Sequence, residues 1–212
     1  MSFLIYLGAA LGAYLLGSIP FGFLVAKAKG IDIRSVGSGN IGATNAMRVL
    51  GKPAGIFVLL MDALKGYVAC TWLVSLVFRC FTFAPEHVET LRIVAGICAV
   101  LGHNYPCWLK FKGGKGIATT AGVYLALAPW ALLIALVVFI VAVVVTRYVS
   151  VGSIAAAIAL PVTVWVMPPH NLFLGIVTTA LGVLAIYKHK GNIQRLMAGT
   201  ENRLGKKSEG AK

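Results

Sequence analysis

The chain has 212 residues, of which 59% are hydrophobic and 12% charged, and its mean hydropathy is +0.88. A soluble domain carries about 25% charged residues, so this composition excludes a soluble globular protein and predicts an integral membrane protein. The formal net charge of +13 would suggest nucleic-acid binding in a soluble protein. In a membrane protein, the distribution of Lys and Arg along the chain instead indicates which loops face the cytoplasm.

Seven apolar segments predict an all-α, polytopic membrane helical bundle. The first segment, 3–26, is uncharged and would form about 36 Å of helix, enough to cross the hydrocarbon, with Pro20 as a kink site. It lacks a basic start and a cleavage site, so we expect a retained helix and not a removable signal peptide. The later spans are expected at 53–78, 90–104, 117–128, 129–146, 150–167 and 171–187.

The charge-free run 117–146 is the ambiguous part of this topology, because it could form one long helix or two short ones that turn at Pro129. With two helices, an external N-terminus places four segments in the cytoplasm: 27–52, 105–116, 146–149 and 188–212. These segments hold 16 of the 19 Lys and Arg, whereas the outer segments hold only Arg79 and Arg92. This split satisfies the positive-inside rule. We therefore predict seven transmembrane helices and a cytoplasmic C-terminus.

Two further expectations concern the organisation of the chain. Five full spans with partly inserted segments is the alternative, because 117–128 is short for a complete crossing. No repeat or second domain is visible, so residues 1–212 are expected to form a single membrane domain, with a polar basic tail after about residue 203. The four cysteines stand singly in apolar segments, which predicts neither a metal site nor a disulfide framework: Cys70, Cys80, Cys98 and Cys107.

The first polar motif, VGSGNIGATNAMRVLG at Val36–Gly51, follows the first span and contains no carboxylate. Its glycines, which include Gly37 and Gly39, permit left-handed backbone conformations that aim N–H groups inward. Arg48 adds a fixed cation with a planar fork of donors. Neutral hydrogen-bonding groups come from Ser38, Asn40, Thr44 and Asn45. The motif could bind an anion such as a phosphate, or it could be a polar connector between two helices; the stretch alone does not decide.

The second motif, FKGGKGIAT at 111–119, lies directly before an apolar helix and follows His103. Backbone N–H groups, a helix N-terminus and point cations make this pattern typical of an anion site. It is not a P-loop, because its Gly-Lys pair is followed by glycine. The alternative is positive-inside anchoring by lysines, which does not require paired glycines. The residues concerned are Lys112, Gly113, Gly114, Lys115 and Gly116.

The third motif, HKGNIQRL…GTE, begins the basic C-terminal segment. His189, Asn192 and Arg195 are spaced to share one side of a helical continuation. A histidine at this position can also be a plain interfacial residue, and Arg147–Ser150 is most simply an interfacial anchor.

Asp62 and Lys65 are charges within the second span, three residues apart on one helix face. Intramembrane charges are expensive and by default functional or paired. Their spacing permits a mutual ion pair, so a structural role is as well supported as contact with a substrate.

The stretches GSGNIGATN…R, HNYP…FKGGKGIAT and HKGNIQRL…GTE resemble, in the same order, the three motifs of the bacterial membrane glycerol-3-phosphate acyltransferases that use acyl-phosphate as donor (the PlsY family). DALKG at 62–66 and RYVS at 147–150 also resemble family features. The resemblance extends over essentially the whole chain.

The resemblance implies transfer of a fatty acyl group from acyl-phosphate to the 1-hydroxyl of glycerol 3-phosphate, giving lysophosphatidate and phosphate. It implies a seven-span protein of the bacterial inner membrane, with a cytoplasmic active site among membrane lipid, no cofactor or metal, and no nucleic-acid partner. The expected catalytic residues are Ser38, Arg48, His189 and Asn192. Substrate contacts are expected from His103, from the glycines and lysines of FKGGKG, from Ser150 and from the remaining polar residues of the first motif; Asp62, Lys65 and Glu201 would be structural.

Two other functions can be weighed against this one. A transporter of a phosphorylated solute could use basic clusters and broken helices, but transporters usually show repeated halves with a midplane site, and no repeat is visible. An acyltransferase of the His-x4-Asp type fails on a direct check: none of the four histidines has an aspartate five residues later.

Overall fold

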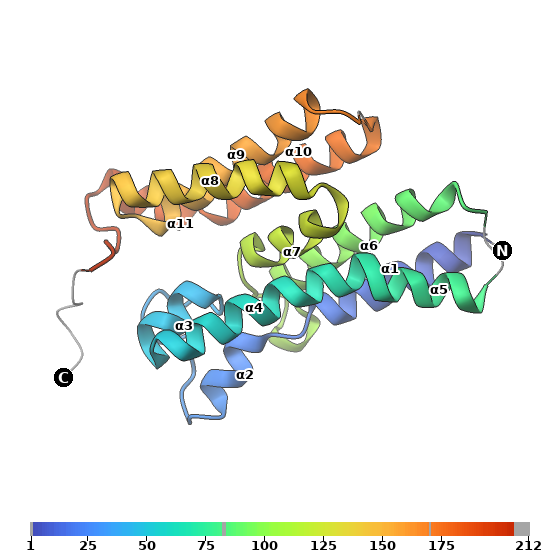
Figure 1. The fold of residues 1–212 in the computed structure, drawn as a ribbon. Coiled ribbons are helices and arrows are strands. Elements are labelled where there is room, and N and C mark those ends of the chain that lie inside the picture. Colours follow the sequence, from blue (N-terminus) through green and yellow to red (C-terminus); the bar gives the residue numbers. More distant parts are fainter. Residues whose placement is uncertain (1, 82–83, 170, 206–212) are drawn as a thin grey trace. The chain divides into compact units, whose positions relative to one another are not determined.

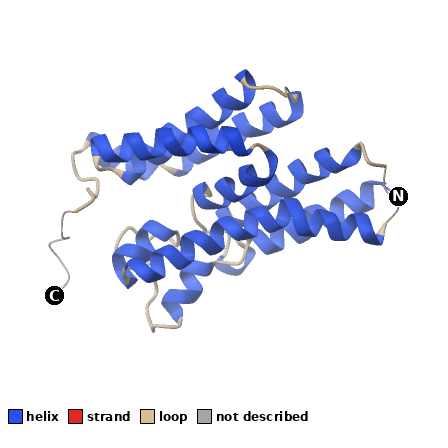
Figure 2. Ribbon diagram, in the orientation of Figure 1, coloured by secondary structure: helices blue, strands red, loops and turns tan. Residues whose placement is uncertain are grey.

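The computed structural model describes residues 2–81, 84–169 and 171–205, and these residues form helices and no strand (Figure 2). The prediction of an all-α protein is confirmed. The chain divides into two compact units, Met1–Pro129 and Trp130–Lys212, and each is described by itself. The single-domain assignment stays a prediction. The basic tail from residue 206 onward, and His170 in the turn before the last span, lie outside the described residues.

The first unit follows a chain of helices that Figure 1 colours from blue to yellow-green. A π-helical turn, η1 (Ala69–Leu73), joins two of them into one continuous run, and a 3₁₀ turn, η2 (Cys107–Leu109), precedes the last. The helices are α1 (Ser2–Gly17), α2 (Phe21–Lys27), α3 (Ala43–Leu50), α4 (Lys52–Val68), α5 (Val74–Cys80), α6 (His87–Asn104) and α7 (Ile117–Leu127).

The first predicted span is broken where Pro20 was expected to kink it. α1 ends at Gly17, α2 begins at Phe21, and the intervening residues are not helical. Proline lacks the N–H that a continuous helix needs, so the carbonyls of the preceding turn need other donors. The Leu16 carbonyl, four residues before Pro20, accepts from the Ile19 N–H over 3.3 Å instead, and within the break the Ile19 carbonyl accepts from Lys65 Nζ over 2.8 Å.

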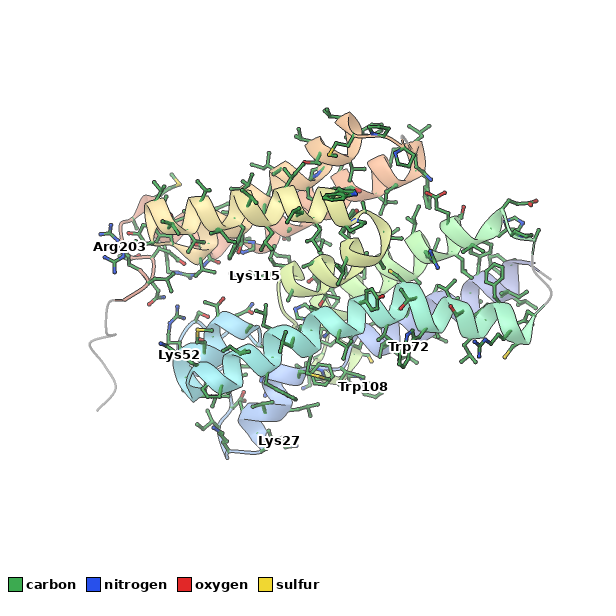
Figure 3. The ribbon with its side chains drawn as sticks, viewed as in Figure 1. Lys27, Lys52, Trp72, Trp108, Lys115 and Arg203 are labelled. Atoms are coloured by element: carbon green, nitrogen blue, oxygen red, sulfur yellow. The ribbon has the colours of Figure 1, made fainter. Side chains whose placement is uncertain are left out.

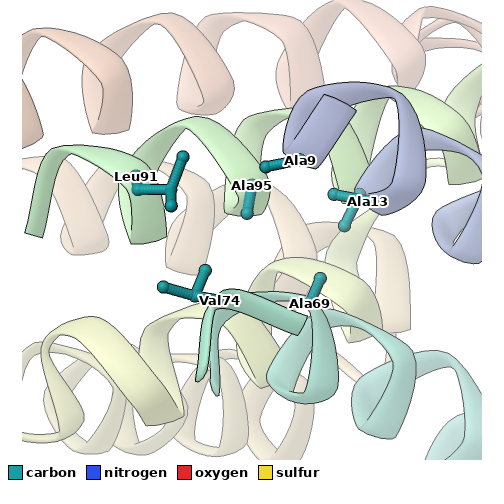
Figure 4. Packing of buried hydrophobic residues seen from close by; sticks show 7 residues of the cluster. Ala9, Ala13, Ala69, Val74, Leu91 and Ala95 are labelled. Atoms are coloured by element: carbon teal, nitrogen blue, oxygen red, sulfur yellow. The ribbon is translucent and has the colours of Figure 1, made fainter. Parts of the chain in front are cut away.

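Glycines let the helices of the first unit approach backbone to backbone. A Cβ at Gly17 of α1 would overlap the Ala99 carbonyl of α6, and one at Gly122 of α7 would overlap the Ala63 carbonyl of α4. Small residues at helix contacts are typical of membrane bundles, where close van der Waals packing stabilises association. The core between α1, the α4–η1–α5 run and α6 is correspondingly rich in alanine, which makes up five of its seven buried residues (Figure 4): Ala9, Ala13, Ala69, Val74, Leu91, Ala95 and Ala99.

The second unit contains α8 (Pro129–Thr146), α9 (Val149–Val166), α10 (Leu172–Lys188) and α11 (Lys190–Met197). The run 117–146 is therefore two helices, as predicted, because α7 ends at Leu127 and Pro129 starts α8. The residue before a proline is disfavoured in the helical region, and Ala128 is indeed non-helical (φ −152°, ψ 72°). α11 continues the chain after a bend of 51°, which confirms the predicted helical continuation at the start of the tail.

Four helical runs among the described residues are long and apolar enough to cross a membrane: Phe3–Lys27, Lys52–Cys80, Pro129–Thr146 and Val149–Val166. The bent pair α10–α11 would add a fifth. α8 exposes large apolar side chains, with Val144 and Val145 more than 70% accessible, as expected of a helix that faces lipid. The structure therefore supports an integral membrane protein, while seven spans and the orientation of the termini stay predictions.

Candidate active site

The loop of the first motif is held by one buried amide, Asn45 on α3. Its Oδ1 accepts a hydrogen bond from the Ser38 backbone N–H (2.8 Å), and its Nδ2 donates to the carbonyls of Ile33 (3.2 Å) and Val36 (3.1 Å). Asn45 is only 1% exposed. An amide that donates and accepts at once can close a loop of this kind without introducing charge. Asn45, predicted to bind substrate, is engaged with the loop backbone, and that prediction remains untested.

The groups that this loop presents outward are Ser38 and Arg48, which are both exposed. Gly37 and Gly39 have φ values of 63° and 69°, in the left-handed region expected for this motif. The guanidinium of Arg48 approaches the first motif from α3, with Nη1 3.5 Å from the Asn45 Oδ1. The loop thus offers a hydroxyl and a cation on a fixed backbone, an arrangement that can hold a phosphate.

The two other polar residues predicted for this motif lie at the start of α3. Asn40 Oδ1 accepts from the Gly42 N–H over 2.8 Å, which orders the turn that leads into the helix. Thr44 is exposed in the first turn of α3.

The glycine loop of the second motif folds back on the end of α6. The N–H of Gly113 donates to the Asn104 carbonyl (3.2 Å), and the N–H of Gly114 donates to the His103 carbonyl (3.1 Å). Two N–H groups that the sequence pattern offered to an anion therefore satisfy the last carbonyls of α6. The pattern of glycines could not reveal this use.

The second motif also places two lysines close to the start of α7. Lys112 is exposed and Lys115 is partly buried just before the helix, where Figure 3 labels it. Gly116 has φ 83° and N-caps α7, whose first N–H groups have no partner within the helix.

Asp62, Lys65 and His103 form a buried network in the first unit. Lys65 Nζ lies 2.8 Å from Asp62 Oδ1, which confirms the ion pair that their spacing permits. His103 Nδ1 lies 3.4 Å from the same oxygen. All three side chains are at most 4% exposed. The sequence could not reveal the contact with His103, because 41 positions separate it from Asp62.

In the second unit, the Glu201 carboxylate gathers the polar residues of the third motif. Its Oε1 accepts from Ser150 Oγ (3.0 Å) and from Asn192 Nδ2 (2.7 Å), and its Oε2 accepts from Arg195 Nε (2.7 Å). Burial raises the pKa of Glu201, but these three hydrogen bonds and the charge of Arg195 together outweigh it, so the pKa lies below its ordinary value. The geometry fits the structural role expected of Glu201.

His189 lies between α10 and α11 and is 2% exposed. Its Nδ1 is 2.8 Å from the carbonyl oxygen of Ala185. A carbonyl can only accept, so Nδ1 carries the proton, and in the neutral ring Nε2 is the basic nitrogen. A histidine held in this tautomer is suited to accept a proton at Nε2.

Two structural contacts near these motifs escaped the sequence analysis. Tyr14 of α1 donates from its hydroxyl to the Tyr105 carbonyl over 2.7 Å, which anchors the start of the glycine loop. Asn104, 1% exposed, lies beside Gly116, where a Cβ would come 2.7 Å from its Oδ1. Tyrosine and asparagine at these positions carry no spacing signal of their own.

The fold and these clusters define a helical membrane protein with cation-bearing loops suited to phosphate. Residues 7–199 match the model of the family described as "Glycerol-3-phosphate acyltransferase". The chain belongs to this family of membrane acyltransferases.

Similar proteins share almost the full length. Glycerol-3-phosphate acyltransferase of Geobacter sulfurreducens is 49% identical over 191 residues, which cover 90% of this chain and 93% of the relative. That of Desulforamulus reducens is 46% identical over 198 residues, covering 93% and 94%. A crystal structure of PlsY (YgiH), an integral membrane glycerol 3-phosphate acyltransferase in its glycerol 3-phosphate form, is 39% identical with a TM-score of 0.85, covering 94% of this chain and 96% of that one.

Proposed function

We propose that this chain transfers a fatty acyl group from acyl-phosphate to the 1-hydroxyl of glycerol 3-phosphate. The products are 1-acyl-glycerol 3-phosphate and inorganic phosphate, and the reaction is the first acylation of bacterial phospholipid synthesis. The choice of glycerol 3-phosphate as the acceptor substrate is supported by one observation. The chain is 39% identical, over 94% of its length, to a solved protein in its glycerol 3-phosphate form. The donor rests on the resemblance of the three motifs and on the chemistry of the residues.

The charge of the candidate site suits these substrates. Both are anions that carry phosphate, and the motifs offer exposed Arg48, exposed Lys112 and partly buried Lys115. Guanidinium and ammonium groups form the strong, charge-assisted hydrogen bonds that phosphate prefers. The carboxylate of the third motif, Glu201, is already neutralised by Arg195 and two neutral donors, so its repulsion of an anion is reduced.

An acyl-phosphate is already activated, so the protein needs mainly to position the substrates and stabilise charge. The acceptor hydroxyl oxygen attacks the carbonyl carbon of the donor. The bond from this carbon to the phosphate oxygen then breaks, and phosphate leaves with the electron pair. The hydroxyl proton passes to a base, for which His189 Nε2 is the proposed acceptor because Nδ1 is committed to Ala185.

We favour direct transfer over a covalent acyl-serine. Ser38 stands in Gly-Ser-Gly and not in the G-x-S-x-G elbow, and its backbone is held by neutral Asn45. Ser38 would then hydrogen-bond a phosphate or the reacting carbonyl. A trapped acyl group on Ser38, or ping-pong kinetics, would contradict this preference.

The proposed location is the bacterial inner membrane, with the motifs facing the cytoplasm. The positive-inside distribution of Lys and Arg supports this orientation. The soluble substrate glycerol 3-phosphate would arrive from the cytoplasm, and the lipid product would remain in the membrane.

The reaction is tested with purified protein in detergent or nanodiscs, supplied with palmitoyl phosphate and radiolabelled glycerol 3-phosphate. We expect labelled lysophosphatidate, and none when palmitoyl coenzyme A replaces the donor. A folded preparation that makes no product from acyl-phosphate contradicts the proposal. Uptake of glycerol 3-phosphate into vesicles without chemical change would favour the transporter instead.

The residue assignment is tested with Arg48→Ala, which should lower kcat/KM by a factor on the order of 10² or more, because a charge-assisted phosphate contact is lost. Arg48→Lys should also be impaired, since lysine cannot bind bidentately. The matched control is Lys29→Ala, another exposed cation, which should retain activity. If the Ser38→Ala variant keeps full activity, Ser38 is not an active-site residue.

A further inference from the structure

The buried network of Asp62, Lys65 and His103 joins three separate parts of the first unit. Asp62 and Lys65 belong to α4, His103 to the last turn of α6, and Lys65 Nζ donates to Ile19 in the break between α1 and α2. The Lys65 ammonium also lies 5.6 Å from the centre of the Phe21 ring. Lys65 therefore neutralises Asp62 and at the same time gives the Ile19 carbonyl a second donor beside the Phe21 N–H.

His103 connects this network to the glycine loop in two ways. Its carbonyl accepts from the Gly114 N–H over 3.1 Å. Its ring packs directly against Gly114, because a Cβ at that position would overlap His103 Nε2. The orientation of the ring therefore limits where the loop backbone can lie, just before Lys115 and the N-terminus of α7.

Stability alone does not account for a buried ion pair at this place. Removing two charges from water is expensive, and well-packed apolar replacements of such pairs are often neutral or stabilising. The oxygen that pairs with Lys65 is the same Asp62 Oδ1 that lies 3.4 Å from His103 Nδ1. Asp62 thus faces both its counter-ion and the ring that bears on the loop.

We propose that Asp62 is a positioning residue: it orients the His103 ring, and the ring in turn sets the position of Gly114 and of the phosphate-binding groups that follow it. Lys65 serves as the counter-ion that keeps Asp62 charged in the interior. This inference rests on the proposed function in one respect, which is that the second motif binds phosphate. The packing of Asp62, His103 and Gly114 does not depend on that function.

Two double variants test it, and they differ only in whether an oxygen faces His103. The acceptor-keeping pair is Asp62→Asn with Lys65→Met, and the apolar pair is Asp62→Leu with Lys65→Met. In both, the Ile19 carbonyl keeps its bond from the Phe21 N–H (3.2 Å). Thermal unfolding in detergent should show similar melting temperatures for the two pairs, because neither leaves an uncompensated charge.

Activity should separate the two pairs. We expect the acceptor-keeping pair to stay within a few-fold of the parent, whereas the apolar pair should raise KM for glycerol 3-phosphate or for the acyl-phosphate on the order of tenfold, since small displacements of positioning groups have large kinetic effects. Equal kinetics of the two pairs would overturn the inference.

Adding His103→Phe completes a double-mutant cycle. If Asp62 acts through His103, the added change should lower kcat/KM of the acceptor-keeping pair but cause little further loss in the apolar pair. Independent, multiplicative losses would overturn the proposal. If the apolar pair does not fold, Asp62→Ala with Lys65→Met replaces it as the arm without an acceptor, and the cycle with His103→Phe is judged by the same criterion.

Failure of the proposed function is distinguishable from failure of this inference. A parent protein that makes no lysophosphatidate contradicts the proposed reaction. The cycle is then measured as the Kd for glycerol 3-phosphate by calorimetry. Additive changes in that Kd, or no glycerol 3-phosphate binding by the folded parent, contradict the positioning role.

Discussion

The glycine loop of the first unit and the Glu201 cluster of the second unit are both made of polar residues, but they are held together differently. The glycine loop is held by backbone bonds from Gly113 and Gly114 to the end of α6. The Glu201 cluster is held by a carboxylate that accepts three side-chain bonds. The glycine loop contains lysines and no carboxylate of its own, whereas the Glu201 carboxylate is paired with Arg195 inside its own cluster.

This difference indicates that the two regions have different roles. A loop ordered by neutral groups can present cations to an anionic substrate, because no carboxylate within the loop competes for them. A carboxylate that is saturated by donors orders its neighbours but offers little to a substrate. The first-motif loop follows the same principle as the glycine loop, because neutral Asn45 closes it. Substitutions at the groups that hold each region therefore test this difference.

The largest effect is expected from Gly114→Ala in the glycine loop. The new Cβ would overlap the buried His103 ring, so the loop or the ring must move, with a loss of about 1–3 kcal/mol in unfolding free energy. Activity should fall at least on the order of tenfold. Gly8→Ala in α1 is the matched control, because no neighbour lies within 4 Å of its new Cβ. Denaturation in detergent measures the unfolding free energy of each variant, and kcat/KM measures its activity. A Gly114→Ala variant with the stability and activity of the parent would contradict the close packing of the loop against His103.

The next effect is expected from Asn45→Ala, which removes two donated bonds and one accepted bond from the first-motif loop. We expect a loss of about 2 kcal/mol, since part of the loop backbone can bond to water instead. Asn40→Ala removes a single bond to Gly42 and should have a smaller effect on the same denaturation assay. Equal losses in the two variants would show that Asn45 does not close the loop.

A smaller effect is expected from Glu201→Gln, which keeps an acceptor for Ser150 and Asn192 but loses the ion pair with Arg195. Arg195 is 37% exposed, so solvent screening limits the loss to about 1 kcal/mol at neutral pH.

The pH dependence of this variant sharpens the test. Because the pKa of Glu201 is lower in the folded protein than its ordinary value of 4.5, its contribution to stability is present above pH 4.5 and is lost as the pH falls through the lowered pKa. In Glu201→Gln the melting temperature should therefore fall less steeply on acidification over that window. An unchanged acid slope would mean that the carboxylate is not stabilised by its donors.

The smallest effect is expected from Asp32→Asn, just before the first motif. Asp32 and Arg34 form an exposed pair of 2.7 Å, and the side-chain hydrogen bond from Arg34 lowers the pKa of Asp32 to about 2. Exposed pairs of this kind contribute little to stability. Melting temperature and activity should both match the parent, and a clear loss in either would assign this pair to the supports of the loop.

The sequence predicted the membrane class, the helical architecture and a kink site at Pro20, and the distribution of Lys and Arg favoured two helices in the run 117–146. These features follow from local composition: long apolar runs, prolines without an N–H, and the charges that bound each run. The motif positions of Ser38, Arg48, Lys115 and His189 were also recognisable, because glycines and cations beside apolar helices form a local pattern.

The bonding partners of these groups, in contrast, depend on how the helices pack. The N–H groups of Gly113 and Gly114 go to α6, the Asn45 amide goes to its own loop, and Asp62 meets His103 across 41 residues of chain. A residue pattern specifies which donors and acceptors exist, but their partners depend on which helices pack together, and in the interior every polar group takes the partner that the fold brings within reach.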